Sequence, residues 1–118
     1  MTQAQSGSQP GAQSGAESGA LSAMQEVAPK LAELTTEMVY GDVWERPGLS
    51  KRDRSLITVA ALTALYRSDQ LRAHIGRALD NGVTPDEIGE LITHMAIYAG
   101  WPTAVNAAGL AREVLDAR

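Results

Sequence analysis

The chain contains two histidines, and their positions are the first indication of a chemical site. His74 and His94 flank the turn at residues 80–87, so helices packed as an antiparallel hairpin around that turn would bring them close together. At 1.5 Å of rise per residue, the two would be offset along the helices by roughly 5 Å. Because histidine exchanges a proton near neutral pH, the pair predicts general acid catalysis. The alternative is that each is a partly buried helix residue with a structural role.

Basic residues in the middle of the chain indicate what such a site would bind. Seven cationic and two acidic residues lie between positions 46 and 77, although the formal net charge of the chain is −4. A basic middle in an acidic protein argues against nucleic acid as a partner and fits a small organic anion. Arg46, Arg52, Arg54 and Arg67 are the candidate ligands, because a guanidinium group binds a carboxylate through two parallel hydrogen bonds. The alternative is that several are ordinary solvent-exposed helix charges.

The composition excludes several kinds of chemistry and bounds the domain. The chain has no cysteine, which removes disulfides, thiolate metal sites and thiol nucleophiles, and two histidines without a third strong ligand predict no metal site. Residues 1–20, rich in Gln, Ser, Gly and Ala, predict a disordered tail, and residues 21–118 predict one domain. The tail resembles neither a signal peptide nor a membrane span, so we expect a cytoplasmic protein with no membrane partner.

The elements that must position these side chains are all predicted to be helices. Five helices follow the tail, no segment is typical of a paired strand, and the fold class is therefore all-α. The helix over residues 51–64 is apolar on most of its circumference, so we expect it to be central and buried by neighbours or by a second subunit. The small, Ala-rich core favours oligomerisation. The expected starts and stops are, in chain order, Pro29, Gly41, Ser50, Ser68, Gly82, Thr84 and Gly100.

Six short segments carry a resemblance to a known family. They are Arg46-Pro47-Gly48-Leu49, Arg54-Ser55-Leu56-Ile57-Thr58, Leu71-Arg72-Ala73-His74, Ala78-Leu79-Asp80-Asn81-Gly82, Thr84-Pro85-Asp86-Glu87-Ile88 and Tyr98-Ala99-Gly100-Trp101-Pro102. In this order and spacing they resemble the carboxymuconolactone decarboxylase family. The resemblance implies a helical protomer that assembles into a ring, a trimer or a hexamer, and a cytoplasmic, cofactor-independent enzyme of aromatic catabolism. The named reaction removes carbon dioxide from 4-carboxymuconolactone to give the enol-lactone of 3-oxoadipate.

The same superfamily has a peroxidase branch, the alkylhydroperoxidase D type, with a Cys-x-x-Cys-x-x-x-His motif and a Glu one helix earlier. Aligned through His74, the two cysteine positions hold Arg67 and Gln70, and the Glu position holds Ser55. Neither Arg nor Gln can form a disulfide, so the peroxidase reaction is excluded. The resemblance implies that Ser55, Arg67, Gln70 and His74 converge on a pocket in the same place as the peroxidase site, lined by different side chains.

Decarboxylation assigns expected roles to these residues. Loss of carbon dioxide leaves an electron pair that must delocalise into the lactone, after which a proton must reach carbon. We expect arginines to hold the carboxylates, His74 or His94 to be the general acid, and Tyr98 to donate to the developing enolate. Trp44 and Trp101 are expected to form an apolar wall beside the departing carboxylate. The resemblance supports only His74 as an inherited pocket residue, and Tyr98 and Trp101 are alternatively core or interface anchors.

Other polar residues have structural alternatives, and three functions fit the sequence. Glu87 is expected to complete a helix cap, and Asn106 is either a buried hydrogen-bonding contact or part of a pocket wall. The first function is the decarboxylase, or a related lactone enzyme. The second is a non-catalytic binding module for an aromatic-derived organic acid, and the third is a structural oligomer with no small-molecule site.

Overall fold

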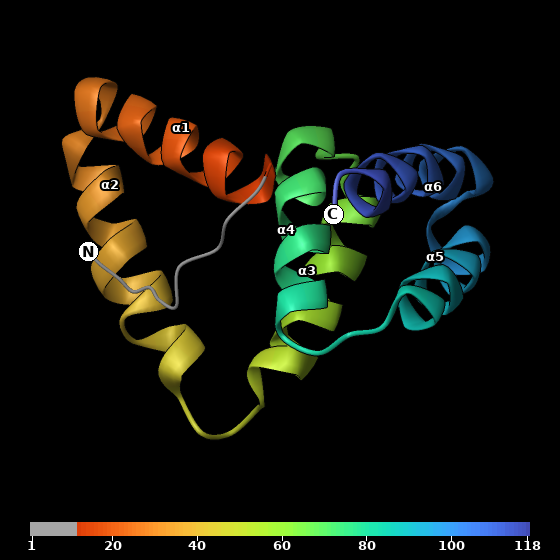
Figure 1. Ribbon diagram of the computed structural model, residues 1–118. Coiled ribbons are helices and arrows are strands. Elements are labelled where there is room, and N and C mark those ends of the chain that lie inside the picture. The colour runs from red at the N-terminus through yellow and green to blue at the C-terminus, as the bar shows by residue number, and fades with distance from the viewer. Residues whose placement is uncertain (1–11) are drawn as a thin grey trace.

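The computed structural model describes the backbone of residues 12–118, and the side chains from residue 19 onward. Six α-helices and no β-strand occur in this part of the chain, so the all-α prediction is confirmed (Figure 1). A π-helical turn, η1 (Thr35–Tyr40), and a 3₁₀ turn, η2 (Val43–Glu45), lie between the second and third helices. The helices are α1 (Ala12–Val27), α2 (Pro29–Leu34), α3 (Lys51–Ala64), α4 (Ser68–Asp80), α5 (Pro85–Ala99) and α6 (Trp101–Asp116).

The sixth helix is α1, and it begins inside the segment predicted to be a tail. Residues 1–11 of that prediction lie outside the described residues, whereas the chain is helical from Ala12 onward. The prediction relied on missing apolar periodicity, but alanine has the highest intrinsic helix propensity and supports a helix without it. Near its end, α1 is tied to the following segment, because the Thr35 hydroxyl lies 3.6 Å from the Met24 sulfur.

The helix predicted over residues 29–41 is in fact two elements. Helix α2 ends at Leu34, and the next six residues form η1. The Thr35 hydroxyl donates a 2.8 Å hydrogen bond to the Leu31 carbonyl at this junction, a contact by which Thr side chains perturb helices. A π turn is wider than an α turn, so the residues after Leu34 face different directions than they would in one continuous helix.

The other predicted helix boundaries depend on local caps, and most of them are confirmed. The Ser50 hydroxyl accepts the Asp53 backbone N–H at 3.0 Å, and Thr84 and Glu87 form a reciprocal capping box at the start of α5. Gly82, just beyond α4, has a φ of +101°, which only glycine adopts without strain.

Ser68 is the exception among the predicted caps. Arg67 occupies the capping position of α4 without a side-chain hydrogen bond, and Ser68 is the first helical residue. The Ser68 hydroxyl accepts a 3.2 Å hydrogen bond from the Asn106 amide instead. Asn106 is thus a half-buried hydrogen-bonding contact between α6 and α4.

Helix α3 is central, as predicted, because it packs against α4, α5 and α6. Within the single chain it is buried on one face, and Ile57 on another face is 56% exposed, so burial by neighbouring helices covers only part of its circumference. The hydrophobic core lies among these four helices. It consists of Val59, Leu71, Ile75, Ala78, Val83, Ile88, Ile92, Ala104, Ala107, Leu110, Ala111 and Val114.

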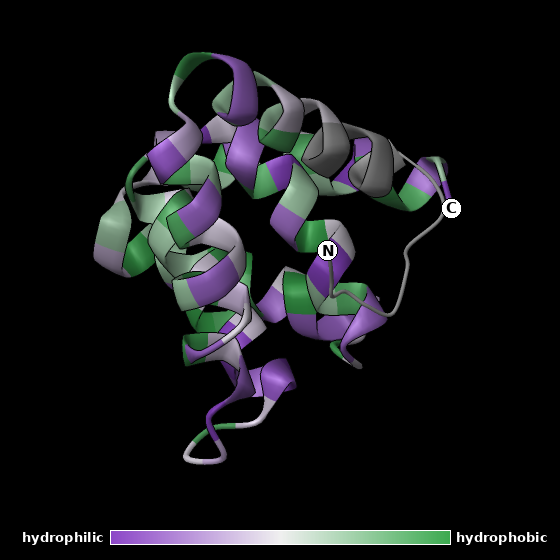
Figure 2. Cartoon of the chain, turned by 90° about the vertical axis from the view of Figure 1, so that its left-hand side faces the viewer, coloured by the Kyte–Doolittle hydropathy of each residue, from purple (hydrophilic) through white to green (hydrophobic). Residues whose placement is uncertain are grey.

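The segment from α1 to η2, here called the N-terminal arm, lies beside this four-helix core and reaches back to it through α1, which contacts α4 (Figure 1). Apolar and polar residues alternate along the arm, as Figure 2 shows from that side. Several of its apolar side chains are exposed, among them Val27 at 84% and Leu31 at 51%. In the described part of the chain, no helix combines the length and apolar character needed to cross a lipid bilayer.

Candidate functional site

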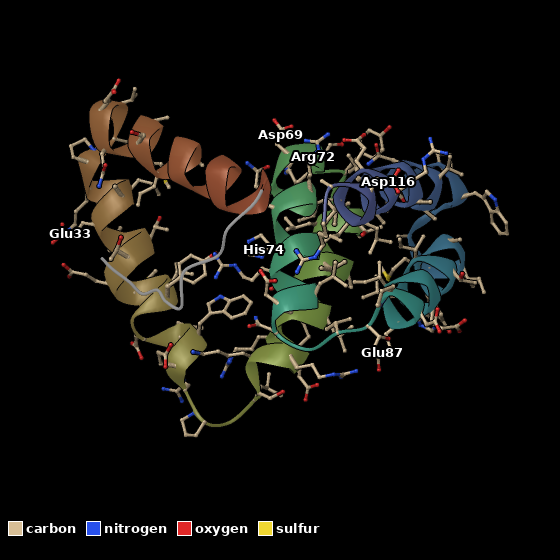
Figure 3. The ribbon with its side chains drawn as sticks, viewed as in Figure 1. Glu33, Asp69, Arg72, His74, Glu87 and Asp116 are labelled. Atoms are coloured by element: carbon tan, nitrogen blue, oxygen red, sulfur yellow. The ribbon has the colours of Figure 1, made fainter. Side chains whose placement is uncertain are left out.

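Four side chains from the arm and from α4 meet in one place, and we call them the His74 cluster: Tyr40, Trp44, His74 and Arg77. His74 projects from α4 toward the arm (Figure 3). The Tyr40 hydroxyl lies 3.5 Å from His74 Nε2, and the Trp44 ring lies 5.8 Å from the Tyr40 ring and 6.2 Å from the His74 ring, between centroids. The Arg77 guanidinium stands 4.6 Å from the centre of the Tyr40 ring.

The local sequence accounts for this meeting. His74 and Arg77 are three residues apart on α4, so they share one face of the helix. Tyr40 ends the π-helical turn, and Gly41 then allows the chain to bend toward Trp44 in η2. A Cβ at Gly41 would lie 2.7 Å from the Glu37 carbonyl oxygen, so only glycine fits there.

Burial controls the charge of His74. Loss of solvent around the ring, assisted by the positive charge of Arg77, lowers the pKa of His74 from 6.5 to about 4. The imidazole is therefore neutral at pH 7 in the free protein. Its Nδ1 atom is buried and has no hydrogen-bond partner in the described structure. The imidazolium acid that the sequence led us to expect is thus absent at neutral pH.

Arg54, on α3, contacts the chain segment that carries Trp44. This half-buried side chain donates a 3.1 Å hydrogen bond to the carbonyl of Arg46, the residue that follows η2, two positions after Trp44. The Arg54 Nε atom is buried without a hydrogen-bond partner among the described residues. Buried polar atoms are normally paired, so this unpaired guanidinium N–H is a candidate donor to an anionic group.

Two other residues expected to bind substrate have structural partners instead. The Arg52 guanidinium pairs with the Glu87 carboxylate and so joins α3 to the capping box of α5. A hydrogen bond from the Thr84 backbone N–H is the largest cause that holds the pKa of Glu87 below its usual value, and the hydrogen bond from Arg52 is the next largest. Ser55 is fully buried, and its hydroxyl accepts a 3.0 Å hydrogen bond from the Asn81 amide, which ties α3 to the end of α4.

The two residues at the cysteine positions of the peroxidase motif are on the surface. Arg67 and Gln70 are both exposed at the start of α4, whereas Ser55 lies in the core. The side chain of Arg46 is exposed as well, and only its carbonyl takes part in the contact with Arg54. The expected convergence of these residues on His74 therefore does not appear in the single chain.

The predicted pairing of the two histidines rests on a hairpin that does not form. Helix α5 packs chiefly on α3 and α6, and its contact with α4 is marginal. His94 is exposed on α5, with its ring centre 4.8 Å from that of Tyr98. Tyr98 is 76% exposed and Trp101 is 69% exposed. These three residues form a surface region separate from the His74 cluster.

Sequence reasoning missed two members of the His74 cluster. Tyr40 was not considered, because it directly precedes the predicted helix stop at Gly41 and the change from α to π winding leaves no mark in the apolar periodicity. Arg77 was counted only within the basic stretch. Its position three residues after His74 was the signal that could have identified it.

A concave region lies between α5 and α6 and has a volume of about 410 Å³. Its lining is mostly apolar, and it includes none of the predicted site residues. It is lined by Pro85, Ile88, Gly89, Ile92, Thr93, Ala108, Ala111, Arg112, Leu115 and Asp116. Among the residues whose side chains are placed, no group of three or more His, Asp or Glu is arranged to hold a metal ion. The chemistry-bearing groups therefore gather at the His74 cluster.

Comparisons with known proteins give one family match and several similar proteins. The sequence profile of the carboxymuconolactone decarboxylase family matches residues 29–113, which include the His74 cluster and Arg54. A 4-carboxymuconolactone decarboxylase of Acinetobacter baylyi is 48% identical over 79 residues, which are 67% of this chain and 59% of that protein. A nitrosuccinic acid decarboxylase of Metarhizium robertsii is 41% identical over 75 residues, which are 64% of this chain and 52% of that protein.

An uncharacterized 15.0 kDa protein of Paracoccus denitrificans is 33% identical over 94 residues, which are 78% of this chain and 70% of that protein. The chain thus spans between half and two thirds of the length of the two decarboxylases that it matches. The family profile covers most of the described residues, and the third relative is matched over more than two thirds of its length. The chain therefore belongs to the carboxymuconolactone decarboxylase family.

Proposed function

We propose that this protein is a cofactor-independent decarboxylase of a small organic acid, 4-carboxymuconolactone or a related lactone or dicarboxylate. The observation that carries the proposal is the His74 cluster, where a neutral imidazole, a phenol, an indole and the guanidinium of Arg77 lie together in a chain of this family. The names of two relatives, both decarboxylases, support the reaction type.

The chemistry of the acids named for these two relatives narrows the substrate class. Nitrosuccinic acid has two carboxyl groups and a nitro group, and 4-carboxymuconolactone has two carboxyl groups and a conjugated lactone. In both compounds an electron-withdrawing group can accept the pair released with carbon dioxide. We therefore expect a substrate with one carboxylate to lose, one to be held, and an electron sink.

The residues of the site suit these three requirements. Arg54 offers a buried N–H to the carboxylate that is retained, and Arg77 adds positive charge nearby. The Trp44 indole supplies an apolar wall, which favours loss of the charged carboxylate as neutral carbon dioxide. The carbon–carbon bond breaks, its electron pair enters the conjugated system, and the Tyr40–His74 pair provides the proton that carbon then takes up.

The test is incubation of the protein with 4-carboxymuconolactone while its ultraviolet absorbance and the release of carbon dioxide are followed. We expect turnover of this lactone or, failing that, of nitrosuccinic acid. Binding of dicarboxylates with no carbon dioxide from either compound would favour the non-catalytic binding module. A thermal-shift screen of organic acids with no stabilisation would favour the structural oligomer.

A further inference from the structure

We propose that the N-terminal arm of one copy of this chain docks on the outer face of α3 of a second copy, in a two-fold symmetric dimer. This contact is independent of the proposed decarboxylase function. It joins two apolar surfaces that the single chain leaves uncovered. The first is the arm ridge, which consists of Leu31, Leu34 and Met38. The second is the α3 face, which consists of Ile57, Ala61, Ala64 and Leu65.

The arm ridge runs along one side of α2 and η1. Leu31 and Leu34 are three residues apart on α2, and Met38 follows four residues later in the wider winding of η1, so the three side chains lie in a row. They are 51%, 38% and 50% exposed, whereas Ala32 on another side of α2 is buried. A row of exposed apolar side chains on a helix is typical of a surface that packs on a partner.

The α3 face lies on the side of the central helix that its own neighbours do not cover. Val59 is fully buried in the core, and Ile57 and Ala61, two residues to either side of it, lie on the opposite side of the helix. Ile57 and Leu65 are 56% and 58% exposed. Between them, the small side chains of Ala61 and Ala64 allow a second helix to approach closely.

The charges beside these two surfaces are complementary. Residues 26–45 of the arm carry five carboxylates and one lysine, whereas residues 46–67, which include α3, carry five cations and one aspartate. Among the residues whose side chains are placed, the exposed carboxylate of Glu37 forms no ion pair. The exposed guanidinium groups of Arg46 and Arg67 form none within that part of the chain either. An acidic arm on a basic face brings opposite charges together around the apolar contact.

The same charges disfavour the α5 surface as the partner of the arm. Helix α5 carries Asp86, Glu87 and Glu90 and no lysine or arginine, so it would repel an acidic arm. A two-fold axis places each arm on the α3 face of the other copy, so the contact forms twice and the pair is closed. Because Tyr40 and Trp44 belong to the arm, a partner that holds the arm also holds these side chains beside His74.

The first test measures the mass in solution of the full chain and of two variants, Leu31→Asp on the arm ridge and Ile57→Lys on the α3 face. Each variant places a charge in the proposed contact, so we expect the dissociation constant to rise about tenfold or more in both. In an equimolar mixture, a mixed pair keeps one unmodified contact and brings the aspartate toward the lysine in the other. The mixture should therefore associate more tightly than either variant alone. Circular dichroism checks that these surface variants are folded.

The second test examines the charges. Glu37→Lys reverses a charge beside the arm ridge, and Glu90→Lys makes the same change on α5 as the matched control. We expect Glu37→Lys to raise the dissociation constant by about three- to tenfold at low salt and by less at high salt, and Glu90→Lys to leave it unchanged.

Four results would overturn the inference. They are a monomeric wild type, weakened association in only one of Leu31→Asp and Ile57→Lys, a mixture no tighter than its components, and equal effects of Glu37→Lys and Glu90→Lys. A monomeric wild type would leave the arm ridge to a different kind of partner. Weakening by Leu31→Asp alone would indicate that two arms pack on each other. None of these results depends on whether the protein decarboxylates a substrate.

Discussion

His74 is the residue whose environment most changes the chemistry expected from its type. A histidine in water would be a natural general acid near pH 7, but burial and Arg77 lower its pKa to about 4 and leave it neutral. The neutral ring can then donate one hydrogen bond and accept one. The same burial makes the free energy of unfolding depend on pH.

This dependence has a defined sign. The pKa of His74 in the folded protein lies below the ordinary value of 6.5. Between pH 6.5 and about 4, His74 is therefore protonated in the unfolded chain but neutral in the folded chain. The contribution of neutral His74 to stability is complete above pH 6.5 and is lost as the pH falls toward 4. The loss amounts to at most about 3 kcal/mol. Urea unfolding at pH 7.5 and 4.5 should show a larger decrease for the wild type than for His74→Gln. Equal decreases would contradict the assigned environment.

Arg54 supports a second prediction about a single residue. Arg54→Ala removes the buried N–H that we assign to the retained carboxylate, so KM or the dissociation constant of a dicarboxylate should rise about tenfold to a hundredfold. Arg54→Lys should restore little, because lysine cannot place a guanidinium N–H there. Titration calorimetry with a dicarboxylate measures the effect, and Arg112→Ala on the exposed side of α6 is the control. Unchanged affinity in Arg54→Ala would remove Arg54 from the site.

At the scale of elements, a feature could be predicted from the sequence when neighbouring residues determine it, and could not when distant contacts determine it. Helices α3 and α5 begin where Ser50 and Thr84 predict, because a cap depends on residues within one turn. The π winding of η1 and the packing of α5 away from α4 depend on distant contacts, and neither was predicted. His74 and Trp44 lie in one region, Tyr40 in that region was missed, and His94 lies on α5, which packs on α3 and α6 and not beside His74.

The end of α4 offers a stability prediction at this scale. Gly82 has a φ of +101°, so Gly82→Ala should lower the free energy of unfolding by about 1 kcal/mol. Gly109 lies within α6 with open space around its Cα, so Gly109→Ala should be neutral or stabilise by up to about 1 kcal/mol. Thermal or urea unfolding of both variants measures the contrast. Equal effects would mean that backbone conformation does not determine the difference.

At the scale of the whole molecule, the single chain leaves apolar side chains uncovered. Where α5 meets α6, Ile97, Tyr98, Trp101 and Val105 are each between 62% and 76% exposed. Contiguous exposed apolar residues are typical of an interface between proteins. We propose that this region and the exposed apolar residues of the arm are covered in a homo-oligomer, a trimer or a hexamer.

The assembly is testable by mass in solution. Light scattering after size exclusion should give an oligomer for the wild type, and an Ile97→Asp, Trp101→Asp variant should dissociate toward the monomer, because burying either carboxylate costs several kcal/mol. Val27→Asp, on the arm, shows whether that region contributes as well. A monomeric wild type would contradict the proposed assembly.

The most direct measurement is the rate of carbon dioxide release from 4-carboxymuconolactone and from nitrosuccinic acid by three forms of the protein. They are the wild type, a Tyr40→Phe, Arg54→Ala variant of the site, and a Tyr66→Phe, Arg112→Ala variant of the surface. We expect the wild type and the surface variant to release carbon dioxide from at least one compound at similar rates, and the site variant to be slower by about 10³-fold. No release by the wild type, or equal rates for the site and surface variants, would contradict a decarboxylase centred on His74.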